Sequence, residues 1–152
     1  MSHLSVLELI VSNFTLSVHA TDTYPVIRFL PQAALPGYAS RWLEDMGKLL
    51  AAGVPFAVVY PEGSQQEGHE DRKVRGLWLK QNRNELAALC RVLVSVEPDV
   101  QKREAIQGQL AGVSKAFGVL QVVAATELEA LGVARSYVAG CAVGGSMTAS
   151  SM

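Results

Sequence analysis

The stretch VPFAVVY, residues 54–60, decides the fold. It is an uninterrupted run of apolar residues, three of them β-branched valines, that follows Gly53 and ends at the polar segment PEGSQQEGHEDRK, residues 61–73. Such a run, with no alternating polar side chains, is typical of a strand that other elements cover on both faces, as in a parallel sheet. The stretch therefore predicts the central strand of an α/β sheet.

The residues before this strand predict a β-hairpin and a helix. Residues 14–20, FTLSVHA, alternate apolar and polar side chains, and residues 25–30, PVIRFL, begin at a proline, where a missing N–H costs least. The turn-forming residues TDTY connect them. Residues 36–52 then have the apolar spacing of a helix that ends before Gly53. On this helix, we expect Trp42 to lie in the core or in an interface, and in the second case its neighbours Leu43 and Met46 would extend an apolar patch suited to self-association.

Helical and strand patterns alternate in the rest of the chain. Strands that alternate with helices predict an α/β layer fold with right-handed crossovers. We therefore expect a mixed four- or five-stranded sheet, with an initial hairpin and later parallel strands, packed against about four amphipathic helices. The later elements are a helix over 69–90, a strand over 92–96, a helix from near Pro98, a strand over 117–125 and a helix over 126–138 capped by Thr126.

Length and composition restrict the class of protein. The chain has 152 residues, which fits one domain, and we expect it over 1–139, followed by an uncharged, flexible tail of small residues over 140–152. The 13 basic and 14 acidic side chains leave almost no net charge, so binding to nucleic acid or to an anionic membrane has no global electrostatic support. Neither a membrane-spanning run nor a secretory signal is evident. We expect a cytoplasmic protein.

No catalytic or metal-binding pattern stands out in the sequence. Two cysteines are too few for a disulfide framework, and Cys90 lies in an apolar pattern typical of a buried side chain. His69, Glu70 and Asp71 are consecutive, so a helix would point them in different directions and they would make a poor metal site. No glycine loop of the phosphate-binding type is present. We expect no metal, no cofactor and no enzymatic activity.

The helix predicted over 69–90 carries the candidate binding residues. At about 100° per residue, its apolar side chains share one broad arc that must face the sheet, and Asn82 falls inside this arc with Arg75 close to it. An amide in such an arc must find hydrogen-bond partners or lose about 1–3 kcal/mol. The apolar residues of the arc are Trp78, Leu79, Leu86 and Leu89.

Two interpretations of these polar residues are open. In the structural one, which we favour, Asn82 bonds a backbone group at the end of a neighbouring strand, and Arg75 extends to the rim with its stem on Trp78. In the functional one, Arg72, Arg75 and Asn82 line a small polar cleft with the loop over 62–73. That cleft would bind an anionic group or a partner's carboxylate, which the planar donors of arginine suit.

The order of elements resembles that of the SpoIIAA-like (STAS-like) α/β domains. The segments PVIRFL, RWLEDMGKLLAAGVPFAVVY, WLKQNRNELAALCRVLVSV and TELEALGVAR resemble small uncharacterised bacterial proteins of that fold, and the resemblance spans residues 14–138. In the anti-sigma-factor antagonists of this family, the loop after the central strand carries an Asp-Ser-Ser-Gly type sequence whose serine a partner kinase phosphorylates. Ser64 stands near the equivalent place, in a loop without that motif, and is the candidate phosphoacceptor that the resemblance implies.

The resemblance also implies a function. It indicates a nonenzymatic cytoplasmic regulatory or adaptor module that acts through protein–protein binding, to an unidentified protein partner or as a homodimer. The alternative is a small-ligand sensor that binds anions in a cleft near residues 61–83. An enzyme of another type would need a convergent set of titratable groups in one pocket.

Overall fold

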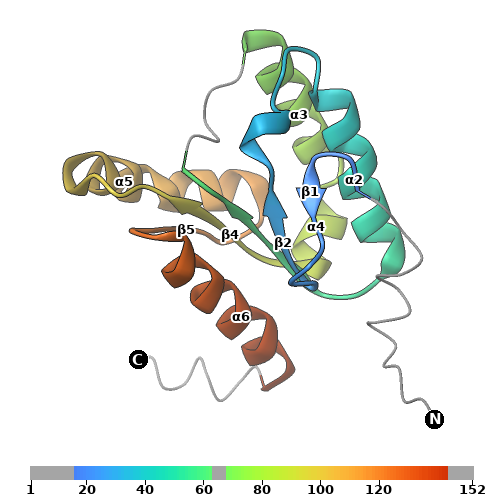
Figure 1. Ribbon diagram of the computed structural model, residues 1–152. Helices are drawn as coiled ribbons and strands as arrows, with labels where there is room; N and C mark the ends of the chain where they lie inside the picture. The colour runs from blue at the N-terminus through green and yellow to red at the C-terminus, as the bar shows by residue number, and fades with distance from the viewer. Residues whose placement is uncertain (1–15, 63–67, 144–152) are drawn as a thin grey trace.

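The computed structural model describes residues 16–62 and 68–143, which form an α/β fold around one five-stranded sheet (Figure 1). The order of the strands in the sheet is their order in the chain. The first two strands pair antiparallel, and all later pairs are parallel. The predicted fold class and mixed sheet are confirmed. The strands are β1 (His19–Ala20), β2 (Val26–Phe29), β3 (Phe56–Tyr60), β4 (Cys90–Val96) and β5 (Gln121–Ala124).

Helices cover both faces of the sheet, and more of them lie on one face than on the other. Neighbouring parallel strands joined in sequence by right-handed crossovers place their connecting helices on one face. Helices α2 to α5 are these connections, whereas α6 follows the last strand and packs on the other face (Figure 1). The helical elements are η1 (Pro31–Ala33), α2 (Ala39–Ala52), α3 (His69–Gln81), α4 (Arg83–Leu89), α5 (Val100–Phe117) and α6 (Glu127–Val143).

Two apolar cores lie on opposite faces of the sheet. On one face, Phe56 and Val58 of β3 pack in a cluster that includes Trp42 of α2 and Leu86 of α4. On the other face, β3 contributes Ala57 and Val59 to a second cluster with α6, whose buried contacts are alanines at 130 and 134. Strand β3 is therefore buried on both sides, as the run of apolar residues predicts.

The first strand is shorter than predicted. Only His19–Ala20 are in β1, whereas the alternating pattern predicts a strand over 14–20. The backbone N–H groups of Ser17 and Val18 donate to the carboxylate of Asp45, at 2.7 and 2.8 Å, so they are not available to a strand ladder. Residues 14 and 15 lie outside the described residues.

The single helix predicted over 69–90 is wrong, because the chain breaks at Asn82 into α3 and α4. Asn82 has φ −111° and ψ 24°, outside the helical range. Its backbone N–H and its side-chain Nδ2 both donate to the carbonyl of Trp78, at 2.9 and 3.0 Å. A short polar side chain that bonds nearby backbone in this way competes with helix propagation. Strand β4 accordingly begins at Cys90, two residues before the predicted start.

The last helix extends into the predicted tail. Its start is capped as expected: Glu129 N–H donates to Thr126 Oγ1 at 3.1 Å, and Glu129 Oε1 accepts from Ala125 N–H at 3.0 Å. The first bond is that of a capping box, whereas the second goes to the residue before the cap and not to the N–H of Thr126. The helix continues to Val143, beyond residue 138, where the predicted helix ends. Residues 144–152 lie outside the described part of the chain.

Asp71 fixes α3 to the start of α2. It is buried although charged, and its two carboxylate oxygens accept from the backbone N–H groups of Gly37, at 2.9 Å, and Ala39, at 3.1 Å. The first N–H groups of a helix have no partner within it. Asp71 supplies this partner from another helix, because the residue at the cap position, Tyr38, makes no side-chain bond there.

Replacing Asp71 with alanine should lower the free energy of unfolding by about 1–3 kcal/mol, because it leaves the buried N–H of Ala39 without an acceptor and removes the bond to Gly37. Urea denaturation measures this change. The control is Lys73→Ala on the exposed side of the same helix, which should stay within about 0.5 kcal/mol of wild type. Equal changes in the free energy of unfolding for the two variants would show that Asp71 does not stabilise the junction between α2 and α3.

Candidate functional site

Arg75, a predicted binding residue, lies on the inner side of α3 among aromatic rings. Its Cζ is 4.9 Å from the ring centroid of Trp42 on α2 and 6.0 Å from that of Tyr60 at the end of β3. Trp78 packs edge-on against Trp42, with centroids 5.3 Å apart. The guanidinium therefore rests on Trp42 of another helix, a contact that the sequence did not predict. A contact of this kind contributes about 0.5–2 kcal/mol, and it joins α3 to both α2 and β3.

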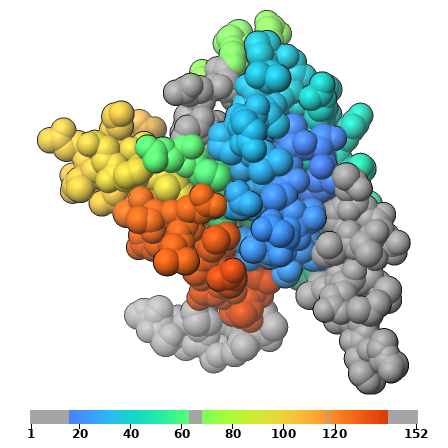
Figure 2. All heavy atoms as spheres, viewed as in Figure 1, coloured from blue at the N-terminus to red at the C-terminus, as the bar shows by residue number. Residues whose placement is uncertain are grey.

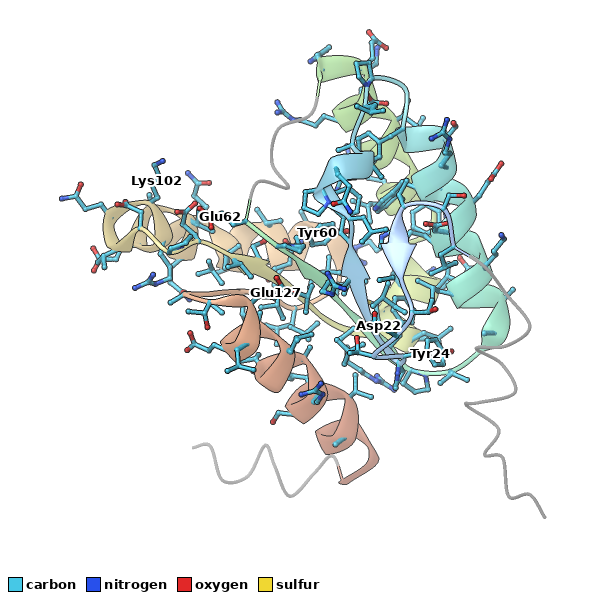
Figure 3. The ribbon with its side chains drawn as sticks, in the orientation of Figure 1. Asp22, Tyr24, Tyr60, Glu62, Lys102 and Glu127 are labelled. Carbon is cyan, nitrogen blue, oxygen red and sulfur yellow. The ribbon has the colours of Figure 1, made fainter. Side chains whose placement is uncertain are left out.

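Tyr60 is the titratable group nearest to this contact. Burial raises the pKa of its phenol above the usual value, and the charge of Arg75 opposes the shift only in part. The ring also packs against Phe29, with centroids 5.5 Å apart. Figure 3 shows Tyr60 within the body of the fold, in contrast to Glu62, which lies where the chain leaves β3. The phenol stays protonated at neutral pH and belongs to the apolar core.

The three predicted binding residues differ in their contacts and exposure. Asn82 uses its amide N–H on the Trp78 carbonyl of its own helix, and not on the end of a neighbouring strand as predicted. It also lies seven residues beyond Arg75, about 10 Å along the helix axis. Arg72 is exposed on α3, one turn before Arg75. The structure thus gives each residue a separate environment, and Ser64 lies outside the described residues.

The outer side of α3 presents a different set of side chains. Leu77 is 57% exposed and Val74 is 39% exposed. Their spacing places them on one side of the helix with the exposed Lys73 and Lys80. We call these four residues, Lys73, Val74, Leu77 and Lys80, the α3 ridge. They form the combination of apolar anchors and flanking charge that protein-binding surfaces use.

The loop before α2 adds apolar surface beside this helix. Leu35 is 63% exposed and lies in the segment that Asp71 ties to the first turn of α3 through Gly37. In Figure 2, green atoms of α3 and blue atoms of this loop meet at the top of the molecule.

A second polar cluster, which the sequence analysis missed, is buried between α2 and the amino-terminal strand. Asp45 accepts from His19 Nδ1 at 2.7 Å, and both side chains are fully buried. His19 Nε2 has no hydrogen-bond partner, and the imidazole packs edge-on against Phe29. A carboxylate on one imidazole nitrogen is the arrangement of a general base. Because the pair is closed off from solvent, it cannot meet a substrate in this conformation.

The sequence did contain a signal for this pair. Asp45 lies three residues after Trp42 and one residue before Met46, so it falls within the apolar stripe of the predicted helix. An acidic residue in such a stripe predicts a buried partner. The identity of the partner, His19, depends on how the hairpin folds against α2, which periodicity does not report.

Other side chains that the sequence singled out are buried in the core. Trp42 is 1% exposed and Met46 is fully buried, so of the two expectations for Trp42 the core position is confirmed, and these two side chains form no exposed patch. Cys90 is the expected buried side chain, and burial raises the pKa of its thiol to about 12, which leaves it unreactive. Among the described residues, no three potential metal-binding side chains of His, Cys, Asp or Glu group together.

Comparisons with known proteins find no relative of this chain. The sequence matches no protein-family model, and neither curated proteins nor solved structures give a match. Within residues 16–62 and 68–143, no helix has both the length and the apolar composition needed to cross a membrane.

Asp45 should make the free energy of unfolding depend on pH in the acidic range. Burial alone would raise the pKa of its carboxyl, but the hydrogen bonds from His19, Ser17 and Val18 together lower it. Because the folded pKa lies below the unfolded value of about 3.9, the unfolded chain binds more protons in acid. The contribution of Asp45 is present above the unfolded value and is lost as the pH falls through the folded value.

Urea denaturation at a series of pH values measures this contribution. The free energy of unfolding should fall below about pH 4 in the wild type, and Asp45→Asn should show a shallower fall. Glu44→Gln, which changes the exposed neighbouring carboxyl, is the matched control and should retain the wild-type slope. The assignment to Asp45 fails if Asp45→Asn and wild type lose stability with the same slope.

Proposed function

We propose that the protein is a nonenzymatic regulatory or adaptor module that binds a protein partner through the α3 ridge. The observation that carries the proposal is the exposure of Leu77 and Val74 between two lysines on one side of a helix. The likeness of its segments to SpoIIAA-like (STAS-like) domains, whose members include switch proteins that act by binding other proteins, favours the same class of function. The cytoplasm is the compartment in which we expect it to act.

The side of α3 opposite the ridge supports this proposal, because its polar side chains make contacts within the fold. Asp71 accepts two backbone hydrogen bonds, Arg75 stacks on Trp42, and Asn82 closes the helix. These polar groups hold α3 in place and do not face a common space. The alternative of an anion sensor built from Arg72, Arg75 and Asn82 therefore has less support than protein binding.

The chemistry of the ridge also specifies the partner. Leu77 and Val74 provide apolar contact area, and Lys73 and Lys80 lie on the flank of that area. The complementary surface is apolar at its centre and carries carboxylates at its edge, because opposite charges at the rim guide association. We therefore propose a partner that presents an acidic segment with exposed apolar side chains.

Affinity capture from an extract of the source cells tests this function. The baits are the wild type, Leu77→Ala, and the double variant Lys73→Glu/Lys80→Glu. Truncation of an apolar anchor at the centre of an interface typically costs more than about 1 kcal/mol, so Leu77→Ala should reduce partner recovery roughly fivefold to tenfold. The double variant should lose recovery most strongly at low salt, where charge attraction is least screened.

The matched control makes the same two Lys→Glu substitutions on another helix. Lys102→Glu/Lys115→Glu alters two exposed lysines of α5 and should capture the partner as well as wild type does. Circular dichroism verifies that each bait is folded. Recovery of the same proteins by wild type and by both ridge variants would refute the proposed surface.

A further inference from the structure

The amino-terminal strand is joined to the sheet by few backbone bonds. β1 has two residues, which pair His19 with Phe29 and Ala20 with Arg28. One further bond runs from the N–H of Leu30 to the carbonyl of Val18, at 2.9 Å. A two-residue strand at a sheet edge has little stability of its own. The position of residues 17–20 must therefore depend on side-chain contacts.

Asp45 supplies those contacts from α2. Its carboxylate accepts three hydrogen bonds from three consecutive residues, namely the backbone N–H groups of Ser17 and Val18 and Nδ1 of His19. The distances lie between 2.7 and 2.8 Å. Hydrogen bonds to a charged acceptor are stronger than neutral ones, and more so where water is excluded. Asp45 thus holds the backbone of the segment on the fold, beside the packing of the Val18 side chain in the main core and of the His19 ring on Phe29.

A second group opposes this attachment. Nε2 of His19 is buried without a hydrogen-bond partner. A polar atom in that state has lost its water and gained nothing in return, so it favours any conformation that lets water reach it. Detachment of residues 17–20 would hydrate both His19 and Asp45. The attached state is therefore favoured by the Asp45 bonds and disfavoured by the same histidine that makes one of them.

We propose that residues 17–20 form a detachable edge strand, held by Asp45, which opens while strands β2 to β5 stay folded and thereby bares the backbone edge of β2. The sheet keeps its support in the open state, because its two apolar cores are built mainly from β2 to β5 and the helices. This opening lies at the edge of the sheet and involves none of the α3 ridge, so it is independent of the proposed function.

Native-state hydrogen exchange of the full chain, followed by NMR at increasing urea, tests the proposal. The amides of Val18 and Leu30 report on the strand, and those of Ala57 and Leu93, which donate to Pro25 and Leu120, report on the remaining sheet. We expect the first pair to exchange roughly 100-fold faster or more, with little dependence on urea, as local openings do. Equal rates and equal urea dependence at all four amides would overturn the proposal.

Asp45→Asn gives a second, quantitative test. If residues 17–20 are already detached in Asp45→Asn, the protection factors of the Ala57 and Leu93 amides should be lower than in the wild type. The ratio should equal the wild-type protection factor of the Leu30 amide, because both quantities measure the free energy of the same opening. Glu44→Gln is the matched control and should leave all four amides unchanged. A larger fall in protection, or failure of Asp45→Asn to fold, would place Asp45 in the global core and contradict a separate opening.

Discussion

The contact between the guanidinium of Arg75 and the ring of Trp42 is the interaction on which the arrangement of α3 depends. Trp42 is buried in the main core, so a charge placed 4.9 Å above its ring fixes the rotation of α3 about its own axis. Asp71 fixes the start of the same helix, and Asn82 fixes its end. With the inner side determined in this way, Val74 and Leu77 have only the outer side to occupy.

Several groups that have the chemistry enzymes use are enclosed in this fold. Cys90 and the His19–Asp45 pair are buried, and Tyr60 packs against the apolar core. The α3 ridge, in contrast, exposes two lysines and two aliphatic side chains. The proposal of a binding module rests on this contrast together with the resemblance of the sequence.

The sequence predicts most of the fold because each strand carries its own pattern. VPFAVVY predicts a strand buried on both faces, and the structure places residues from it in both cores. The helix break at Asn82 does not follow from periodicity, because the apolar arc continues from Trp78 to Leu86 across it. The partner of Arg75 could not be predicted either, since Trp42 lies on another helix and reaches it only through the tertiary fold. Asp45 was predictable as a buried carboxylate, but its three donors were not.

The most direct measurement is a double-mutant cycle between Arg75 and Trp42, using Arg75→Met, Trp42→Leu and the double variant in urea denaturation. If the guanidinium serves to hold α3 on Trp42, its removal should cost much less once the ring is gone. The predicted coupling free energy is about 0.5–2 kcal/mol. Additive effects, with no coupling within error, would mean that Arg75 does not anchor α3 and would remove the reason for assigning its outer side to binding.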